Sequence, residues 1–140
     1  MSIKHLEQSM NDLAYRIIAG APSPVAPFSH AVETGDWVFL TGQIPQDPTN
    51  DAASFPVDIA AQTRQTMENL KTVLKGLDLG LGNVVAVRVF LTDFYRDYSE
   101  MNAIYESYFP NDQRPARTCI GVTGLAREAL VEIDLIARRT

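Results

Sequence analysis

Residues 58–77 carry a stripe of mainly apolar side chains at steps of three and four, and this spacing constrains the fold more than any other feature of the chain. The stripe consists of Ile59, Thr63, Met67, Leu70, Val73, Leu74 and Leu77. Because an α-helix turns once in about 3.6 residues, these side chains share one face and predict a helix packed on a core. Asp58 can cap its first turn, and Gly76 marks its end.

Strand signals lie on both sides of this helix. Residues 29–33 and 37–41 are β-rich and flank Thr34-Gly35-Asp36, which predicts an antiparallel hairpin. Residues 84–91 form a continuous β-branched run that is typical of a central strand. The first helix therefore has a sheet to pack against.

A second helix and two more strands complete the pattern. Asp93 can cap a helix near residues 96–109, and two strands close the chain at about residues 118–122 and 130–137. The short link between these strands contains Gly124, which predicts an antiparallel hairpin. The order of elements predicts an α+β domain with two helices on one face of a mixed sheet.

The second face of such a sheet also carries apolar groups that two helices cannot cover, so we expect an oligomer. The length of 140 residues favours one domain spanning the whole chain. The net charge of -5 repels a phosphate backbone, so we expect no nucleic-acid partner.

Composition also bears on location. Cys119 is the only cysteine, which excludes an internal disulfide and favours a cytoplasmic location. The first residues lack the apolar run of a signal peptide, and no stretch is long and apolar enough to cross a bilayer. We therefore expect no membrane partner.

Two residues near the C-terminus carry the candidate chemistry. In the last strand, alternate residues from Val131 onward should face the helices, so Glu132 should point the other way. In the preceding strand Ile120 and Val122 should face the core, so Arg117 and Cys119 should share the face of Glu132, away from the helices. Same-face positions on paired strands lie roughly 5 to 8 Å apart, which would let Arg117 and Glu132 reach one small ligand.

The two residue types suit hydrolysis of a small acid. Arginine grips a carboxylate with a planar fork, and a partly buried glutamate can orient or deprotonate a water. The alternative is a structural ion pair between Arg117 and Glu132 at a subunit interface, and spacing alone favours this commoner arrangement. The enzymatic interpretation therefore requires Arg117 and Glu132 to lie on the same side of the sheet, beside an opening.

Several segments together resemble one known family. They are Ala26-Pro27-Phe28-Ser29-His30-Ala31-Val32, Leu40-Thr41-Gly42-Gln43-Ile44-Pro45, Asp58-Ile59-Ala60-Ala61-Gln62-Thr63-Arg64-Gln65, Met101-Asn102-Ala103-Ile104-Tyr105, Arg114-Pro115-Ala116-Arg117-Thr118-Cys119 and Val131-Glu132-Ile133. In this order and spacing, the chain resembles the reactive intermediate deaminase (Rid, or YjgF-like) family over residues 21–138. Residues 1–12 extend beyond the common start.

The resemblance implies a chorismate-mutase-like fold and a homotrimer whose sheets form a central β-barrel, with sites in clefts between subunits. Members that deaminate hydrolyse enamine or imine intermediates such as 2-aminoacrylate to 2-oxo acids and ammonia. They act as 2-iminobutanoate/2-iminopropanoate-type deaminases in the removal of reactive metabolites. They use no metal or organic cofactor, so the expected partner is a small imino or 2-oxo acid.

Site roles also follow from the resemblance. Arg117 matches the arginine that binds the substrate carboxylate, and Glu132 matches the glutamate that positions the water. Cys119 matches a position that contributes backbone contacts near this water, and Gly42 and Asn102 match other site positions.

Two residues depart from the family pattern. Phe28 stands where tyrosine is frequent, which keeps an apolar wall but removes a hydroxyl, and His30 replaces a smaller or amide residue. These changes leave open a deaminase of a larger enamine such as an aminomuconate, and a non-catalytic trimer that binds a small carboxylate. Ribonuclease activity, known for some relatives, fits the acidic charge least.

Overall fold

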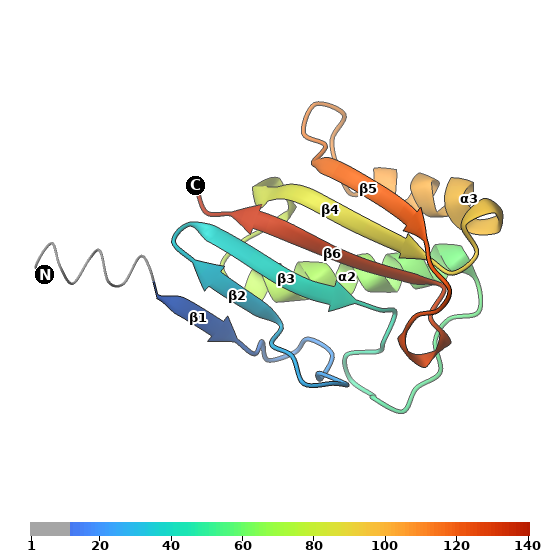
Figure 1. Ribbon diagram of the computed structural model, residues 1–140, viewed down its shortest axis with the longest axis horizontal. Helices are drawn as coiled ribbons and strands as arrows, with labels where there is room; N and C mark the ends of the chain where they lie inside the picture. The colour runs from blue at the N-terminus through green and yellow to red at the C-terminus, as the bar shows by residue number, and fades with distance from the viewer. Residues whose placement is uncertain (1–11) are drawn as a thin grey trace, which may run out of the picture.

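Strand β6 (Val131–Arg138) lies in the interior of a six-stranded mixed sheet in the computed structural model, which describes residues 12–140. The strand order is β1 (Leu13–Arg16), β2 (Ala31–Thr34), β3 (Trp37–Gln43), β6, β4 (Val84–Leu91) and β5 (Ala116–Gly121). Figure 1 shows this order across the sheet. The N-terminal extension was predicted to span residues 1–12, and its residues 1–11 lie outside the described residues.

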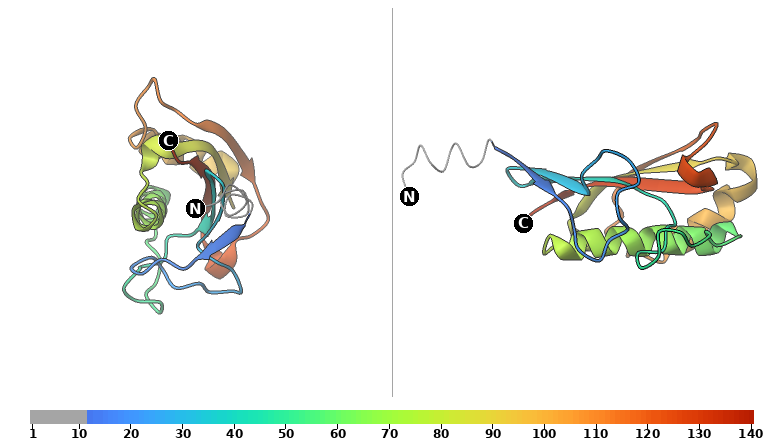
Figure 2. Two further views of the ribbon diagram at one scale, coloured as in Figure 1. Left: turned by 90° about the vertical axis from the view of Figure 1, so that its left-hand side faces the viewer. Right: turned by 90° about the horizontal axis from the view of Figure 1, so that it is seen from below.

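Helices α2 (Ile59–Gly76) and α3 (Phe94–Glu106) lie on one face of the sheet, as predicted (Figure 2). Asp58 caps α2 by accepting a 2.8 Å hydrogen bond from the backbone N–H of Ala61. Asp93 caps α3 in the same way, through the N–H of Arg96 at 3.3 Å. The α+β fold class is therefore confirmed. Between residues 12 and 140, no helix combines the length and apolar character that a membrane span requires.

The core lies between α2 and the central strands. The predicted stripe on α2 is buried along its length and packs against inward-facing residues such as Val87, Val89, Ile133 and Leu135. The hairpin of β2 and β3 is also confirmed, with Thr34 opposite Trp37 in an antiparallel ladder. Gly35 adopts a φ of 57° at the turn, a value that a residue without Cβ tolerates best.

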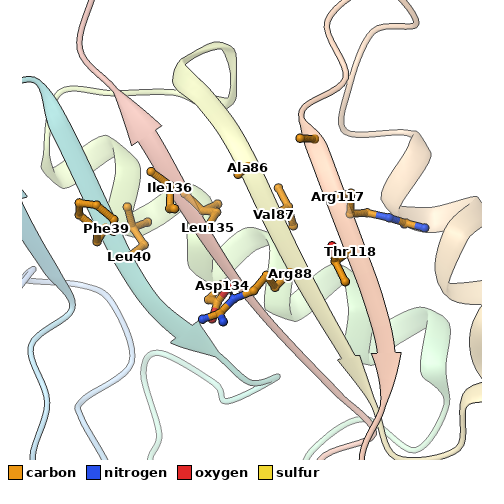
Figure 3. Close-up of a pocket in the computed structure, with 11 residues that line it drawn as sticks. Phe39, Leu40, Ala86, Val87, Arg88, Arg117, Thr118, Asp134, Leu135 and Ile136 are labelled. Carbon is orange, nitrogen blue, oxygen red and sulfur yellow. Dashed lines mark hydrogen bonds and ion pairs between the residues drawn. The ribbon is translucent and has the colours of Figure 1, made fainter.

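No helix of the described part of the chain covers the opposite face of the sheet, which carries exposed apolar groups. Phe39 and Ile120 are 45% exposed there, and Arg88 donates two hydrogen bonds to the carboxylate of Asp134. The pair lines a hollow of about 390 Å³. Figure 3 shows the two side chains pointing toward each other. This face fits the expectation of an oligomer, which stays a prediction.

The predicted hairpin between the last two strands is wrong. Strand β4 lies between β5 and β6, parallel to β5 and antiparallel to β6. The connecting loop passes around the end of β4, where Val122 donates a backbone hydrogen bond to Leu91 and Thr92 donates one to Leu130. A short link in the sequence therefore joins two strands that do not pair.

Candidate functional site

Arg117 and Cys119 lie on the helix-covered face of the sheet, contrary to the predicted parity. Their partners in the parallel ladder are Val87 and Val89, whose side chains are buried in the core. Ile120 instead points to the uncovered face. The prediction placed Ile120 in the core because it is apolar, but Ile120 lies on the face that no helix within residues 12–140 covers.

Glu132 lies on the uncovered face, opposite to that of Arg117. It is registered with Phe90 of β4, whereas Val87, the partner of Arg117, is registered with Leu135. Two strand spacings across the sheet and three residues along it separate the two Cα atoms by about 14 Å. The predicted approach of Arg117 and Glu132 within one chain is therefore wrong.

Arg117 belongs to a first half-site between β5 and α3. Its Nη1 donates a 2.7 Å hydrogen bond to Oδ1 of Asn102, and its Cζ lies 4.8 Å from the ring centroid of Tyr105. The same side chains line a pocket of about 290 Å³ together with Arg114. In Figure 3 Arg117 points from β5 away from the Arg88–Asp134 pair. This half-site offers a fixed cation to an anionic ligand.

The aromatic ring of Tyr105 lies against the guanidinium of Arg117 and is uncharged. Burial raises the pKa of Tyr105 to about 12, although the nearby charge of Arg117 acts in the opposite direction. The ring therefore remains neutral at physiological pH and presents its π face to the cation. Its hydroxyl is buried and has no hydrogen-bond partner within residues 12–140.

Glu132 belongs to a second half-site at the end of β3. A register irregularity between Leu40 and Gln43 brings Gly42 against the carboxylate of Glu132, and Phe28 lines the same pocket of about 110 Å³. Other walls of this pocket are mainly apolar and come from Pro22, Val25, Ala26, Ile44 and Ala126. Gly42, Phe28 and Glu132 are thus brought together as one half-site.

The environment of Glu132 makes it a better proton acceptor than an exposed glutamate. Half-burial raises the pKa of its carboxyl, and the like charge of Asp134 adds to this effect. A carboxylate with increased proton affinity can take a proton from a bound water more readily at neutral pH.

Cys119 lies near the first half-site but has the properties of a packed thiol. Burial raises its pKa, while the charge of Arg117 partly opposes this shift. A raised pKa keeps the thiol protonated and weakens it as a nucleophile. Its expected backbone contact with a substrate water stays a prediction.

Several pocket residues were not among the sequence candidates. Tyr105 was not identified as a pocket residue, although its position three residues after Asn102 places both on one face of α3. Nothing in the sequence predicted that residues 22–26 and Ala126 line a pocket. They lie in irregular segments, which have no periodic pattern of apolar residues.

Comparison with known proteins supports a family assignment. The family model described as endoribonuclease L-PSP matches residues 18–139. A RutC family protein of Pyrococcus horikoshii is 39% identical over 117 residues, covering 84% of this chain and 90% of the relative. The 2-iminobutanoate/2-iminopropanoate deaminase of Escherichia coli K12 is 36% identical over 121 residues, covering 85% and 92%. The crystal structure of a protein of unknown function of the Rid family from Yersinia pestis superposes with a TM-score of 0.85 at 32% identity, covering 91% and 100%.

Proposed function

The chain belongs to the endoribonuclease L-PSP family, which includes the Rid (YjgF-like) proteins, and we propose that it hydrolyses reactive imines of small 2-amino acids to 2-oxo acids and ammonia. The family-level role as a deaminase is supported by relatives that carry that name at 36% identity. The substrate named in those relatives is a short imino acid, and its carboxylate suits the cationic half-site around Arg117.

The active site forms between two copies of the chain in this proposal. The supporting observation is that Arg117 and Glu132 occupy separate half-sites on opposite faces, each beside its own pocket. One copy would supply Arg117, Asn102 and Cys119, and its neighbour Glu132 with Gly42 and Phe28. The apolar uncovered face provides the surface for such assembly, and the homotrimer implied by the family resemblance would repeat this contact around a ring.

The reaction then needs positioning and one acid–base group. Arg117 holds the substrate carboxylate, and Glu132 takes a proton from a water as the oxygen bonds to the imine carbon. Glu132 passes this proton to the imine nitrogen, which gives a neutral carbinolamine. Glu132 then takes the proton of the carbinolamine hydroxyl and transfers it to the nitrogen as the carbon–nitrogen bond breaks, so that ammonia leaves and a carbonyl forms. Proton and oxygen balance is complete with one water.

A larger dicarboxylic enamine, of the aminomuconate type, is the second candidate. Arg114 lines the pocket of Arg117 and is the feature that could receive a second carboxylate. In the other half-site Glu132 is the one charged lining residue among residues 12–140, and it would repel such a group. We therefore favour a short, uncharged substrate side chain.

The proposal is tested with imines generated in situ by an amino-acid oxidase or a serine dehydratase. Hydrolysis is measured as the decrease in the amount of imine that semicarbazide can trap. Wild-type protein should accelerate this loss, Arg117→Ala should abolish the acceleration, and Arg64→Ala, an exposed arginine on α2, should not. Undiminished hydrolysis by Arg117→Ala contradicts the mechanism. Binding of pyruvate without imine hydrolysis would instead identify a non-catalytic carboxylate-binding protein.

A further inference from the structure

His30 is buried, at 1% exposure, and both of its ring nitrogens bind backbone groups. The N–H of Ile18 donates to Nδ1 at 2.8 Å, and Nε2 lies 2.7 Å from the carbonyl oxygen of Pro22. A carbonyl oxygen only accepts and a backbone N–H only donates. The ring proton must therefore reside on Nε2, and Nδ1 must carry no proton so that it can accept the bond from Ile18. The neutral imidazole therefore joins two points of the segment that follows β1.

The segment anchored by His30 forms few other hydrogen bonds. Residues 22–27 form no helix or strand, and Pro22, Pro24 and Pro27 have no N–H to donate. In the part of the chain that the structure describes, the bond from His30 to Pro22 is the hydrogen bond that joins this stretch to the rest of the molecule, since the bond from Phe28 to Ala26 is local.

The same segment forms one wall of the pocket that contains Glu132. Pro22, Ser23, Val25, Ala26 and Phe28 all line that pocket. The carboxylate of Glu132 is held on the other side by β6 and Gly42. The distance between the wall and the carboxylate, and hence the room beside the reacting carbon, depends on where the segment is fixed.

We propose that His30 is a positioning residue that sets the size of this pocket and thereby selects among imino acids by the length of their side chains. The inference rests on the proposed deaminase function. His30 does not contact the substrate in this scheme, because its ring is enclosed and both nitrogens are occupied.

Two substitutions separate hydrogen bonding from packing. In His30→Gln the amide oxygen can accept from Ile18 and the amide nitrogen can donate to Pro22, so the anchor is retained. In His30→Leu the apolar volume is largely kept but both bonds are lost. Imine hydrolysis by each variant is measured with a short substrate, 2-iminopropanoate, and with the longer imine derived from leucine.

We expect His30→Leu to raise KM for the longer imine about tenfold relative to the shorter one, with kcat nearly unchanged, because a displaced wall alters side-chain binding. His30→Gln should retain the wild-type ratio. Hydrogen exchange of residues 18–28 should be faster in His30→Leu and unchanged in His30→Gln.

Two results would overturn the role of His30. One is an unchanged KM ratio in His30→Leu, and the other is an equal loss in His30→Gln and His30→Leu. If wild-type protein hydrolyses no imine, the proposed function is wrong. Hydrogen exchange then still tests whether His30 fixes the segment of residues 22–27. Equal exchange of residues 18–28 in all three proteins would then refute it, whereas faster exchange confined to His30→Leu would support it.

Discussion

Gly42 lies so close to Glu132 that a methyl group on its Cα would come within 2.6 Å of the carboxylate oxygen Oε2. A real Cβ does not tolerate such a distance, so the carboxylate can hold its place only because residue 42 has no side chain. The irregularity in β3 and the absence of a Cβ together bring backbone and acid into contact.

Gly42→Ala should therefore lower imine turnover by roughly 100-fold, since a shift of about 1 Å in a reacting group has an effect of that size. Steady-state assays measure the loss, and circular dichroism checks that the fold persists. Gly82→Ala is a matched control, because a Cβ there would meet no atom within 4 Å. Full activity in Gly42→Ala would show that the observed position of Glu132 is not needed.

Asn102→Ala should weaken substrate binding, because the guanidinium of Arg117 loses the 2.7 Å bond that fixes its direction. We expect KM to rise about tenfold, which corresponds to one charge-assisted hydrogen bond, with a smaller change in kcat. Asn50→Ala removes a 3.0 Å bond to the backbone of Ala52 in an exposed loop away from both pockets and serves as the control. An unchanged KM would mean that Arg117 is held by other contacts or does not bind substrate.

The pH dependence of activity should respond to Asp134. Burial and then the charge of Asp134 raise the pKa of Glu132, so the acid limb of kcat/KM should lie above the usual range for a glutamate. Asp134→Asn removes the like charge and frees Arg88, and both effects lower the pKa of Glu132. The acid limb should then move to lower pH. Asp112→Asn, at an exposed position, should leave it in place, and a shift to higher pH in Asp134→Asn would refute the assignment of Glu132 as the base.

Glu132→Gln should stabilise the protein while abolishing turnover. Because the pKa of Glu132 is higher in the folded than in the unfolded state, the folded state binds its proton more tightly. Stability is therefore lost as pH rises from the unfolded pKa through the folded pKa. Melting temperatures measured from pH 4 to 8 should show an advantage of the variant that grows with pH. A constant difference across this range would contradict the raised pKa.

Local patterns predicted most of the elements correctly. The stripe on α2, its cap at Asp58 and the hairpin around Gly35 each depend on neighbouring residues, so the sequence alone contains their signal. The cap at Asp93 and the interior strand β4 follow for the same reason.

Local sequence patterns could not predict which strand pairs with β5 or which face of the sheet each of its side chains occupies. Ile120 is apolar and exposed, whereas Arg117 lies toward the helices and is stabilised by Asn102 and Tyr105 of α3. The alternation of apolar residues misleads here because Ile120 points to the face of the sheet that no helix of residues 12–140 covers. The separation of Arg117 from Glu132 likewise depends on β4 entering between two strands that are close in sequence.

Mixing two inactive variants tests the shared site most directly. Arg117→Ala and Glu132→Gln should each lack activity alone, but after unfolding and refolding together they should recover about one quarter of wild-type turnover. Recovery follows because a random neighbour pair has that chance of combining an intact Arg117 with an intact Glu132 from different copies. Refolded wild-type protein provides the reference. No recovery from mixed oligomers would contradict a site formed between copies.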